Sequence, residues 1–501
     1  MLKYTGHPLV DVGIATITAF AGKRDPTKLT EDDLGKMADY MAREYVQQPL
    51  KSFLTVAFTS NAWFAQDAYN PDKPGLSAEK RNERQQKRAK WLGRHLRQWA
   101  SETSDDEGER DIFTGERSMS VELSGKLPPG RAGRAQVPLA LGDEYINFYT
   151  NGDPGLAVSG KTVLGLQAFP LGCAKCGGRL LAVHSDNQEL IYHFAATFLR
   201  RNRHLVQLAQ AAGSKKMEEA HRSYRTLLIE VLLEADWMRR EERQDERLSS
   251  ITAYHLSNSG QGPGLDIYYL PLEIIGFLRE MQTADYHNEW NAIVRRAWEV
   301  PPKKKGGKKS TKPFQPRRNW LYEDLFDLPD NAARFLRTYF LRIALRYAKG
   351  KTDPRVDYSL QNEADLVSWK ITERFLRRIM YMDKERIEQI RTMGDRLAEY
   401  VKNQNDRRFF REFFIEQRYG YFRTALIKAN LAHVKHGHPP IITLDPYIAV
   451  FEEGDELARP DWRLARDLVL IRMVERLYDQ GWLGDNVDVI PEQAEEESKT
   501  A

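Results

Sequence analysis

Cys173 and Cys176 are the only cysteines of the 501-residue chain, and their C-x-x-C spacing is followed by two glycines. This spacing allows two thiolates of one turn to face a single zinc ion, and glycines give such a turn its backbone freedom. A structural zinc site has four ligands, and the nearby His184 and His193 do not complete a standard arrangement. A redox pair would need a cysteine at a helix start, whereas a strand is expected to follow. The pair predicts a half-site for zinc, with zinc as the suggested cofactor, or a structural turn.

His433, His436 and His438 form a second group, at the end of a predicted helix. They could hold a metal ion, but no carboxylate completes the group, and histidine at a helix C-terminus also interacts favourably with the helix dipole. The sequence contains no phosphate-binding loop, serine-hydrolase elbow or zinc-protease motif. These residues assemble no convincing active site, and a metal-dependent nuclease using these histidines or the cysteines stays open as an alternative.

Basic residues form three groups that could contact phosphates. They are the predicted helix 78–99, the segment 301–318, which carries six lysines and two arginines with no acid, and the arginine-rich C-terminal helices. Phosphate contacts give affinity without sequence information. The candidate backbone contacts are Lys303, Lys304, Lys305, Lys308, Lys309, Lys312, Arg317, Arg318, Arg377, Arg378, Arg407, Arg408 and Arg411.

Two polar loops could read base edges, because short polar side chains on a rigid tip fit a DNA groove. One is the turn of a predicted hairpin at 251–270, and the other lies at 59–66; either could also be an ordinary turn. The candidate reading residues are Asn61, Gln66, Asn258, Ser259 and Gln261.

The periodicity of apolar residues and the turn residues predict an α+β, predominantly helical fold that positions these groups. It has a mixed N-terminal region, a small β-rich module around the cysteines and an all-α C-terminal bundle. The predicted parts are 1–100 (mixed), 101–188 (loops, strands and the cysteine turn), 189–300 (helices and the hairpin), 301–318 (basic loop) and 319–501 (helical bundle). The predicted C-terminal helices are 331–347, 366–381, 383–403, 407–421, 422–436 and 462–479.

Several segments carry more specific predictions. Residues 8–20 mix β-branched and small residues and could form a strand or a buried helix. Thr30 is expected to cap a helix that runs to Tyr45. Residues 145–169 predict strands with glycine turns, residues 216–238 predict one helix, and residues 257–264 predict a long turn.

Composition bounds the class of protein. A hydrophobic content of 41% is typical of a soluble globular protein, and no apolar run approaches the roughly 20 residues of a membrane helix. The first residues carry no secretion signal, and two cysteines argue against a disulfide framework, so we expect a cytoplasmic protein. The net charge of +4 averages basic segments and an acidic C-terminal stretch, so the body of the chain is more basic than the total.

The order of these pieces resembles the large subunit of type I-B CRISPR interference complexes (Cascade), in the branch named for a CXXC-CXXC region. The resemblance rests on Thr5–Gly13, Phe169–Gly178, Tyr254–Gly260 followed by Ile267–Pro271, and on the helical last third. It spans most of the chain.

One departure concerns the zinc. The first C-x-x-C-G of the family would fall at Asp111–Gly115, where Asp111 and Thr114 stand in the cysteine positions. Two thiolates remain, so the cysteine turn looks like half of an ancestral zinc clasp.

The resemblance implies a non-catalytic protein in an antiviral ribonucleoprotein complex. Such a subunit recognises the PAM in double-stranded DNA, promotes unwinding and R-loop formation, and supports recruitment of the helicase-nuclease, while base pairing reads the rest of the target. The implied partners are crRNA, target DNA, the helicase-nuclease and the other Cascade subunits, namely the backbone, crRNA 5′-end-binding and small subunits. The small subunit could arise from an internal start at Met380, Met382 or Met393. A free-standing nucleic-acid-binding scaffold is a further alternative.

Overall fold

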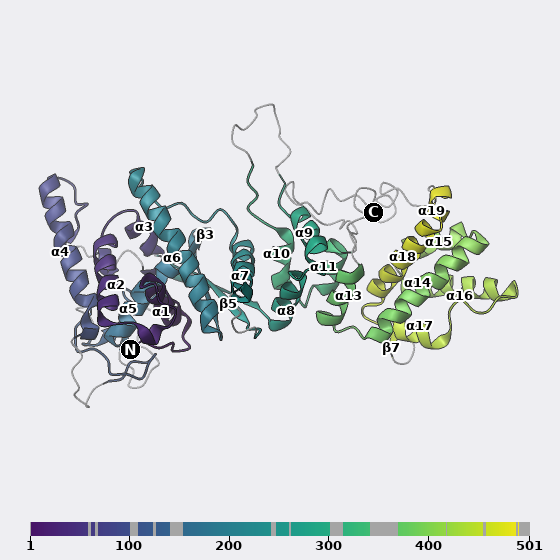
Figure 1. Ribbon diagram of the computed structural model, residues 1–501, viewed down its shortest axis with the longest axis horizontal. Coiled ribbons are helices and arrows are strands. Elements are labelled where there is room, and N and C mark those ends of the chain that lie inside the picture. The colour runs from purple at the N-terminus through teal and green to yellow at the C-terminus, as the bar shows by residue number, and fades with distance from the viewer. Residues whose placement is uncertain are drawn as a thin grey trace, which may run out of the picture. The chain divides into compact units, whose positions relative to one another are not determined.

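The chain forms two compact units, made of Met1–Glu280 with Trp298–Phe326, and of Met281–Ala297 with Asp327–Ala501. Figure 1 labels their elements and colours them by residue number. The computed structural model describes residues 2–58, 62–65, 69–100, 109–123, 127–140, 154–241, 247–259, 262–300, 314–340, 369–416, 418–453, 457–486 and 489.

The first unit is mixed, and its helices surround a small antiparallel sheet. The helices are α1 (Pro8–Phe20), α2 (Glu31–Glu44), α3 (Leu50–Phe58), α4 (Ala78–Leu96), α5 (Gly160–Ala168), α6 (Gln188–Ala211), α7 (Tyr224–Glu241), α8 (Leu272–Met281) and α10 (Trp320–Asp324). The strands are β1 (Arg131–Ala132), β2 (Leu156–Ala157), β3 (Ala174–Cys176), β4 (Arg179–Ser185), β5 (Ile251–Ser259) and β6 (Gly262–Leu270). With the helical second unit, these elements confirm the predicted α+β, predominantly helical class.

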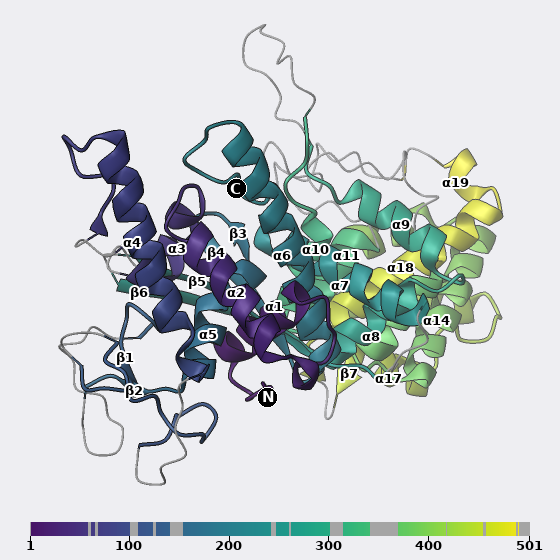
Figure 2. The same ribbon diagram turned by 60° about the vertical axis from the view of Figure 1, so that its left-hand side comes forward.

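The main sheet has the order β3-β4-β5-β6, with every neighbouring pair antiparallel. Figure 2 shows the four strands side by side. The predicted hairpin is therefore confirmed, but the predicted long turn is wrong. Strands β5 and β6 pair as far as Ser259 and Gly262, because the ladder continues through the polar and glycine residues that had indicated a turn.

Helix α1 lies at the centre of the first unit, and ten of its residues are buried. It is helical rather than a strand, and Pro8 occupies its first turn, where proline is tolerated. A helix that is apolar on all sides is expected in a core. At Gly13 a Cβ atom would lie 2.0 Å from the backbone oxygen of Gly165, so α1 and α5 touch through their backbones.

Local signals decide the remaining predictions in this unit. Thr30 caps α2 in a capping box with Asp33, as expected. The strands predicted at 145–169 are wrong where the structure describes that segment, apart from the two-residue β2. The hydroxyl of Ser159 accepts a hydrogen bond from the Thr162 amide and starts helix α5 instead. The helix predicted to begin at residue 216 begins only at Tyr224, because the preceding residues contact a strand and a loop.

The second unit is helical. Its elements are α9 (His287–Arg296), α11 (Ala332–Tyr339), α13 (Trp369–Arg378), α14 (Lys384–Gln404), α15 (Arg407–Ile415), α16 (Tyr419–Lys435), α17 (Leu444–Phe451), β7 (Glu452–Glu453), β8 (Leu457–Ala458), α18 (Trp462–Asp479) and α19 (Trp482–Asp485). The predicted bundle is confirmed in the described ranges, apart from the short β7–β8 pair. The predicted break between two helices after Tyr421 lies earlier, between Ile415 and Tyr419.

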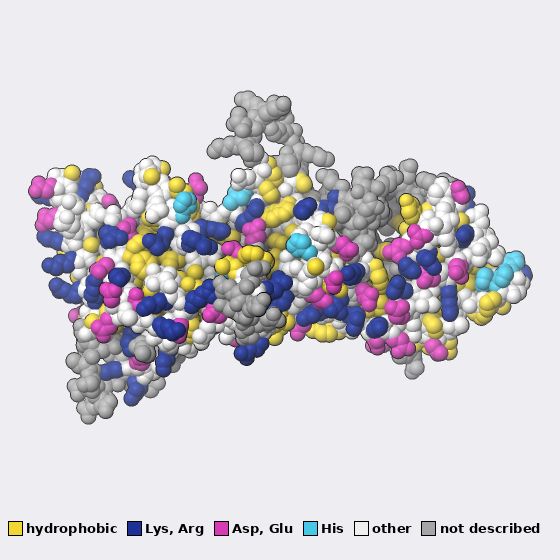
Figure 3. All heavy atoms as spheres, in the orientation of Figure 1, with side chains coloured by type: hydrophobic (Ala, Val, Ile, Leu, Met, Phe, Trp, Pro, Cys, Tyr) yellow, Lys and Arg dark blue, Asp and Glu magenta, His cyan; other side chains and the backbone are white. Residues whose placement is uncertain are grey.

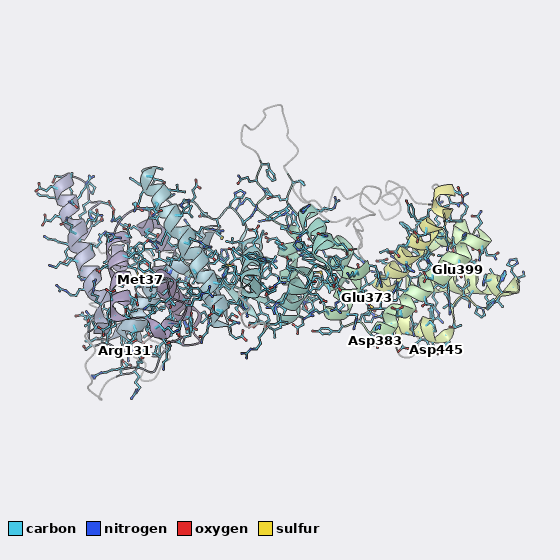
Figure 4. The ribbon with its side chains drawn as sticks, viewed as in Figure 1. Met37, Arg131, Glu373, Asp383, Glu399 and Asp445 are labelled. Atoms are coloured by element: carbon cyan, nitrogen blue, oxygen red, sulfur yellow. The ribbon has the colours of Figure 1, made fainter. Side chains whose placement is uncertain are left out.

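Helices α14 and α18 pack closely in this unit. A Cβ atom at Gly394 would lie 2.6 Å from the Cβ of Arg472, so glycine lets the two helices approach. Asp383, labelled in Figure 4, is the N-cap of α14, and its side chain accepts a hydrogen bond from the Glu385 amide at 2.9 Å. Among the described residues, no helix combines the length and apolar character needed to cross a bilayer.

Candidate nucleic-acid interface

The two glycines after Cys176 form the two-residue loop of a β-hairpin. Cys176 pairs with Arg179, and Gly177 and Gly178 have φ angles of 58° and 80°. Positive φ at both central residues is the requirement of a type I′ turn, whose twist matches that of the flanking strands. The glycines are therefore needed by the hairpin itself, whether or not a metal is present.

The two thiols belong to the core of the first unit. Cys173 and Cys176 are free and buried, and the Cys173 thiol donates a hydrogen bond to the Phe169 carbonyl oxygen at 3.2 Å. Burial raises the pKa of Cys173 well above its usual value and raises the pKa of Cys176 to about 12. In the metal-free chain this burial favours the protonated thiols.

Asp111, in a cysteine position of the family pattern, holds its own loop. One carboxylate oxygen accepts hydrogen bonds from the amides of Phe113 (2.7 Å) and Thr114 (3.2 Å), and the other accepts one from the Ser159 amide (2.6 Å). Its contacts thus fix the loop 111–115 against the start of α5. The residues present do not fit a zinc clasp.

In the part of the chain that the structure describes, no three His, Cys, Asp or Glu side chains are grouped to hold a metal ion. This applies to the histidines of α16 and the turn after it, where the rings of His433 and His438 stack at 4.7 Å. Burial first, and the charges of His438 and His436 second, lower the pKa of His433.

Sequence reasoning missed a buried polar link between the chain start and the sheet. Asp11 on α1 accepts hydrogen bonds from the Thr5 amide (2.6 Å), the Thr5 hydroxyl (2.9 Å) and the Gly6 amide (3.0 Å). The Nε2 atom of His184 on β4 lies 3.0 Å from the second oxygen of Asp11. His184, weighed as a zinc ligand, therefore joins the sheet to α1. An aspartate inside an otherwise apolar helix was the signal for this link.

The hairpin β5–β6 changes one expectation about DNA reading. The Asn258 side chain is fully buried, and its oxygen accepts a hydrogen bond from Arg134 at 3.2 Å. Asn258 lies within the ladder, opposite Pro263, and not on an exposed tip, so it is withdrawn as a base-reading candidate. Ser259 is the last residue of β5 and pairs with Gly262.

Other candidates lie outside the described residues. They are Asn61, Gln66, Gln261, Lys303, Lys304, Lys305, Lys308, Lys309 and Lys312. The structure does describe both ends of the basic segment 301–318.

The two ends of the basic segment are held together as a stem, residues 298–300 and 314–319. Trp298 forms a bridge with Asn319, and the Glu299 amide donates to the Arg318 carbonyl oxygen at 2.9 Å. The Glu299 carboxylate accepts a hydrogen bond from the Arg317 amide at 2.9 Å. The guanidinium of Arg318 lies over the Trp320 ring at 5.6 Å. The described residues on both sides of the lysines are therefore bonded to one another.

A strap, residues 214–223, connects this stem to the cysteine hairpin. The Ala220 amide donates to the Lys175 carbonyl oxygen on β3 at 2.8 Å. The Ser223 amide donates to the Arg317 carbonyl oxygen at 3.0 Å, and the Arg317 side chain donates to the His221 carbonyl oxygen at 3.3 Å. Hydrogen bonds thus connect the cysteine hairpin to the stem through the strap.

Helix α4 is the second basic surface, and Figure 3 shows Lys and Arg side chains gathered along it. Lys80, Arg81, Lys90 and Arg94 are exposed and form no ion pair with the described residues. Arg88, by contrast, is fully buried and belongs to the packing of the helix. The predicted basic helix is confirmed in structure, and its contact with phosphates stays a prediction.

The C-terminal candidates lie on two helices of the second unit. Arg377 and Arg378 end α13, and Arg407, Arg408 and Arg411 lie on α15. Arg408 pairs with Glu412 at 2.8 Å, whereas Arg377 forms no ion pair among the described residues. Their role on a displaced DNA strand stays a prediction.

Comparison with known proteins adds no assignment. No protein-family model matches the chain, and no curated protein sequence matches it.

Proposed function

We propose that the chain is the non-catalytic large subunit of a crRNA-guided DNA surveillance complex, as its resemblance to the Cascade large subunit implies. In this proposal it recognises a PAM in duplex DNA, promotes unwinding and R-loop formation, and supports recruitment of a helicase-nuclease. It works in the cytoplasm with crRNA and the other Cascade subunits.

The observation that carries the proposal is the anchored base of the basic segment. Six lysines lie between Trp298 and Asn319, which are bridged, and the stem is bonded to the strap. A basic segment on a fixed base can grip the backbone of duplex DNA at a defined distance from a second element of the same body. The hairpin β5–β6 is such an element, because β5 and β3 both belong to the sheet that the strap contacts.

Roles follow for the remaining candidates. Lysines 303–312 with Arg317 and Arg318 would hold the phosphates beside the PAM, without sequence preference. Ser259, Gln261, Asn61 and Gln66 remain the candidates for reading or wedging base pairs. The exposed cations of α4, α13 and α15 would follow a displaced strand.

Expression of the tagged chain together with its neighbouring genes and a crRNA array tests the proposal. We expect crRNA and several partner subunits to co-purify with the chain, and the assembly to bind duplex DNA that carries a matching target. Binding should depend on the flanking bases in a library of randomised PAMs. A chain that never associates with crRNA would contradict the proposal.

Variants of the chain within that assembly separate base-reading contacts from phosphate contacts. Substitutions at Ser259 and Gln261 should shift the preferred PAM, and an unchanged preference across the library would rule out the hairpin end as the reader.

A purified chain that cuts DNA alone, and loses this activity in His436→Ala, would instead favour the metal-dependent nuclease.

A further inference from the structure

The turn of the cysteine hairpin holds an anion. The Gly178 amide donates a hydrogen bond to one oxygen of the Glu219 carboxylate at 3.0 Å, and the Lys175 ammonium lies 3.3 Å from the other oxygen. Successive residues with positive φ turn their amides toward one side, and such concave backbone sites bind carboxylates and phosphates. Burial alone would raise the pKa of Glu219, but the Gly178 amide and Lys175 outweigh it, and the pKa is lowered.

This bound carboxylate is accessible from solvent. Gly177, Gly178 and Glu219 are exposed, and Glu219 lies on the strap and not inside a helix or strand. An anion from outside can therefore reach the same amides, provided that Glu219 leaves them. The Glu219 side chain can move away without a rearrangement of the sheet, because the strap is attached to β3 through the backbone amide of Ala220.

Two further arginines lie near enough to the turn for their charges to act on it. The charges of Arg201 and Arg317 both reach Cys176, the residue before the turn, where they oppose the dominant effect of burial on its pKa. Both arginines are exposed, and neither forms an ion pair with a described residue. Arg317 also belongs to the stem of the basic segment, so the turn lies beside the base from which the lysines extend.

We propose that Lys175 and the amides of Gly177 and Gly178 form a binding site for a backbone phosphate of duplex DNA, in which the Glu219 carboxylate occupies the phosphate position until DNA displaces it. This inference rests on the proposed function, since it assigns one phosphate contact beside the basic segment. A phosphodiester and a carboxylate each offer two oxygens that share one negative charge, so the same donors serve both. Two anions cannot share these donors, and DNA must compete with Glu219.

Competition sets the signs of the expected effects. Glu219→Gln removes the competing charge and should tighten binding of a short mixed-sequence duplex by about two- to fivefold, the range that an exposed ion pair represents. Lys175→Ala removes a phosphate contact and should weaken binding by a similar factor. It should also lower the slope of log affinity against log salt by about 1.

Glu116→Gln is the matched control. Glu116 pairs with Lys161 at 2.9 Å, so the variant removes the same charge by the same substitution from a similarly exposed ion pair, and neither residue belongs to the hairpin, the strap or the stem. Equal tightening by Glu219→Gln and Glu116→Gln would reduce the effect to net charge and overturn the site. No tightening by Glu219→Gln would overturn it as well.

The experiment uses the purified full-length chain, fluorescence anisotropy of the duplex, and single-stranded RNA as a second probe. Tightening by Glu219→Gln for RNA alone would overturn the assignment to duplex DNA. The result does not depend on crRNA or partner subunits, so failure of the chain to assemble with crRNA and failure of this site are separate outcomes.

Discussion

Individual arginines differ in whether an acidic side chain already binds them, and one region of each unit shows the difference. In the first unit, Arg317 and Arg318 extend from the stem and form no ion pair among the described residues. In the second unit, Arg386 donates to both oxygens of Asp461, at 2.8 and 2.9 Å. A guanidinium that joins two helices in this way is already bound to an anion. The difference teaches that the number of arginines in a segment does not measure its capacity to bind phosphate.

The largest test of this difference concerns the basic segment. Replacing its six lysines by alanine should weaken binding to all duplexes alike and reduce the slope of log affinity against log salt by up to about 5, since each phosphate contact contributes about 0.9. Anisotropy titrations at several salt concentrations measure both quantities. A selective loss for one PAM would contradict a purely backbone role.

The cysteine turn offers the next largest effect. With the pKa of Cys176 raised to about 12, its thiolate fraction at neutral pH falls about a thousandfold below that of an ordinary exposed cysteine, and burial raises the pKa of Cys173 as well. Alkylation by iodoacetamide should therefore be very slow in the native chain and fast after denaturation. A chelator should leave the native rate unchanged. Faster alkylation after chelation, with stoichiometric zinc in the pure protein, would show a metal site after all.

Breaking an internal pair should affect stability instead of binding. Arg386→Ala leaves the Asp461 carboxylate without its bidentate partner and should lower the free energy of unfolding by about 2–3 kcal/mol. Denaturant titration followed by circular dichroism measures this loss. The matched variant Arg377→Ala, from an arginine without an ion pair among the described residues, should stay within about 0.5 kcal/mol of the parent.

The smallest effect comes from a single stem arginine. Arg317→Ala should weaken duplex binding by about two- to fivefold and lower the salt slope by about 1, with little change in stability. Arg408→Ala removes the same charge from the Arg408–Glu412 pair of α15. Equal weakening by both variants would erase the distinction between paired and unpaired arginines.

The sequence predicted the helical elements well because their signals are local. The capping box at Thr30 and the apolar periodicity of α6 and α18 lie within a few residues of the elements they define. Helix α5 was missed because its glycines resemble turn residues. Gly160 is required instead by its contact with Trp99, which is far away in sequence, because a Cβ atom at Gly160 would lie 2.4 Å from the Trp99 backbone nitrogen. Close packing of two backbones leaves no local signal.

The sequence predicted which residues could form the candidate site, but it did not predict which of them lie close together. The cations at 301–318 and the cysteine turn were each visible in the sequence, but their proximity through the strap was not. The strap itself was predicted as the start of a helix. Its backbone bonds to Lys175 and Arg317 involve residues distant in sequence, and these contacts override its helical propensity. Asn258 was misjudged for the same reason, since Arg134 buries it from another loop.

The contact between Gly13 and Gly165 has a mechanical consequence. Because the backbones of α1 and α5 touch there, α1 can face α5 in only one orientation about its own axis. Rotation of α1 would drive neighbouring side chains into α5. This orientation keeps Asp11 directed toward His184, and the contact between the two side chains fixes β4 to α1. If bent DNA exerted a force on the hairpin β5–β6, the force would be transmitted through β4 to helix α1. We therefore expect the sheet and α1 to move together as one rigid body.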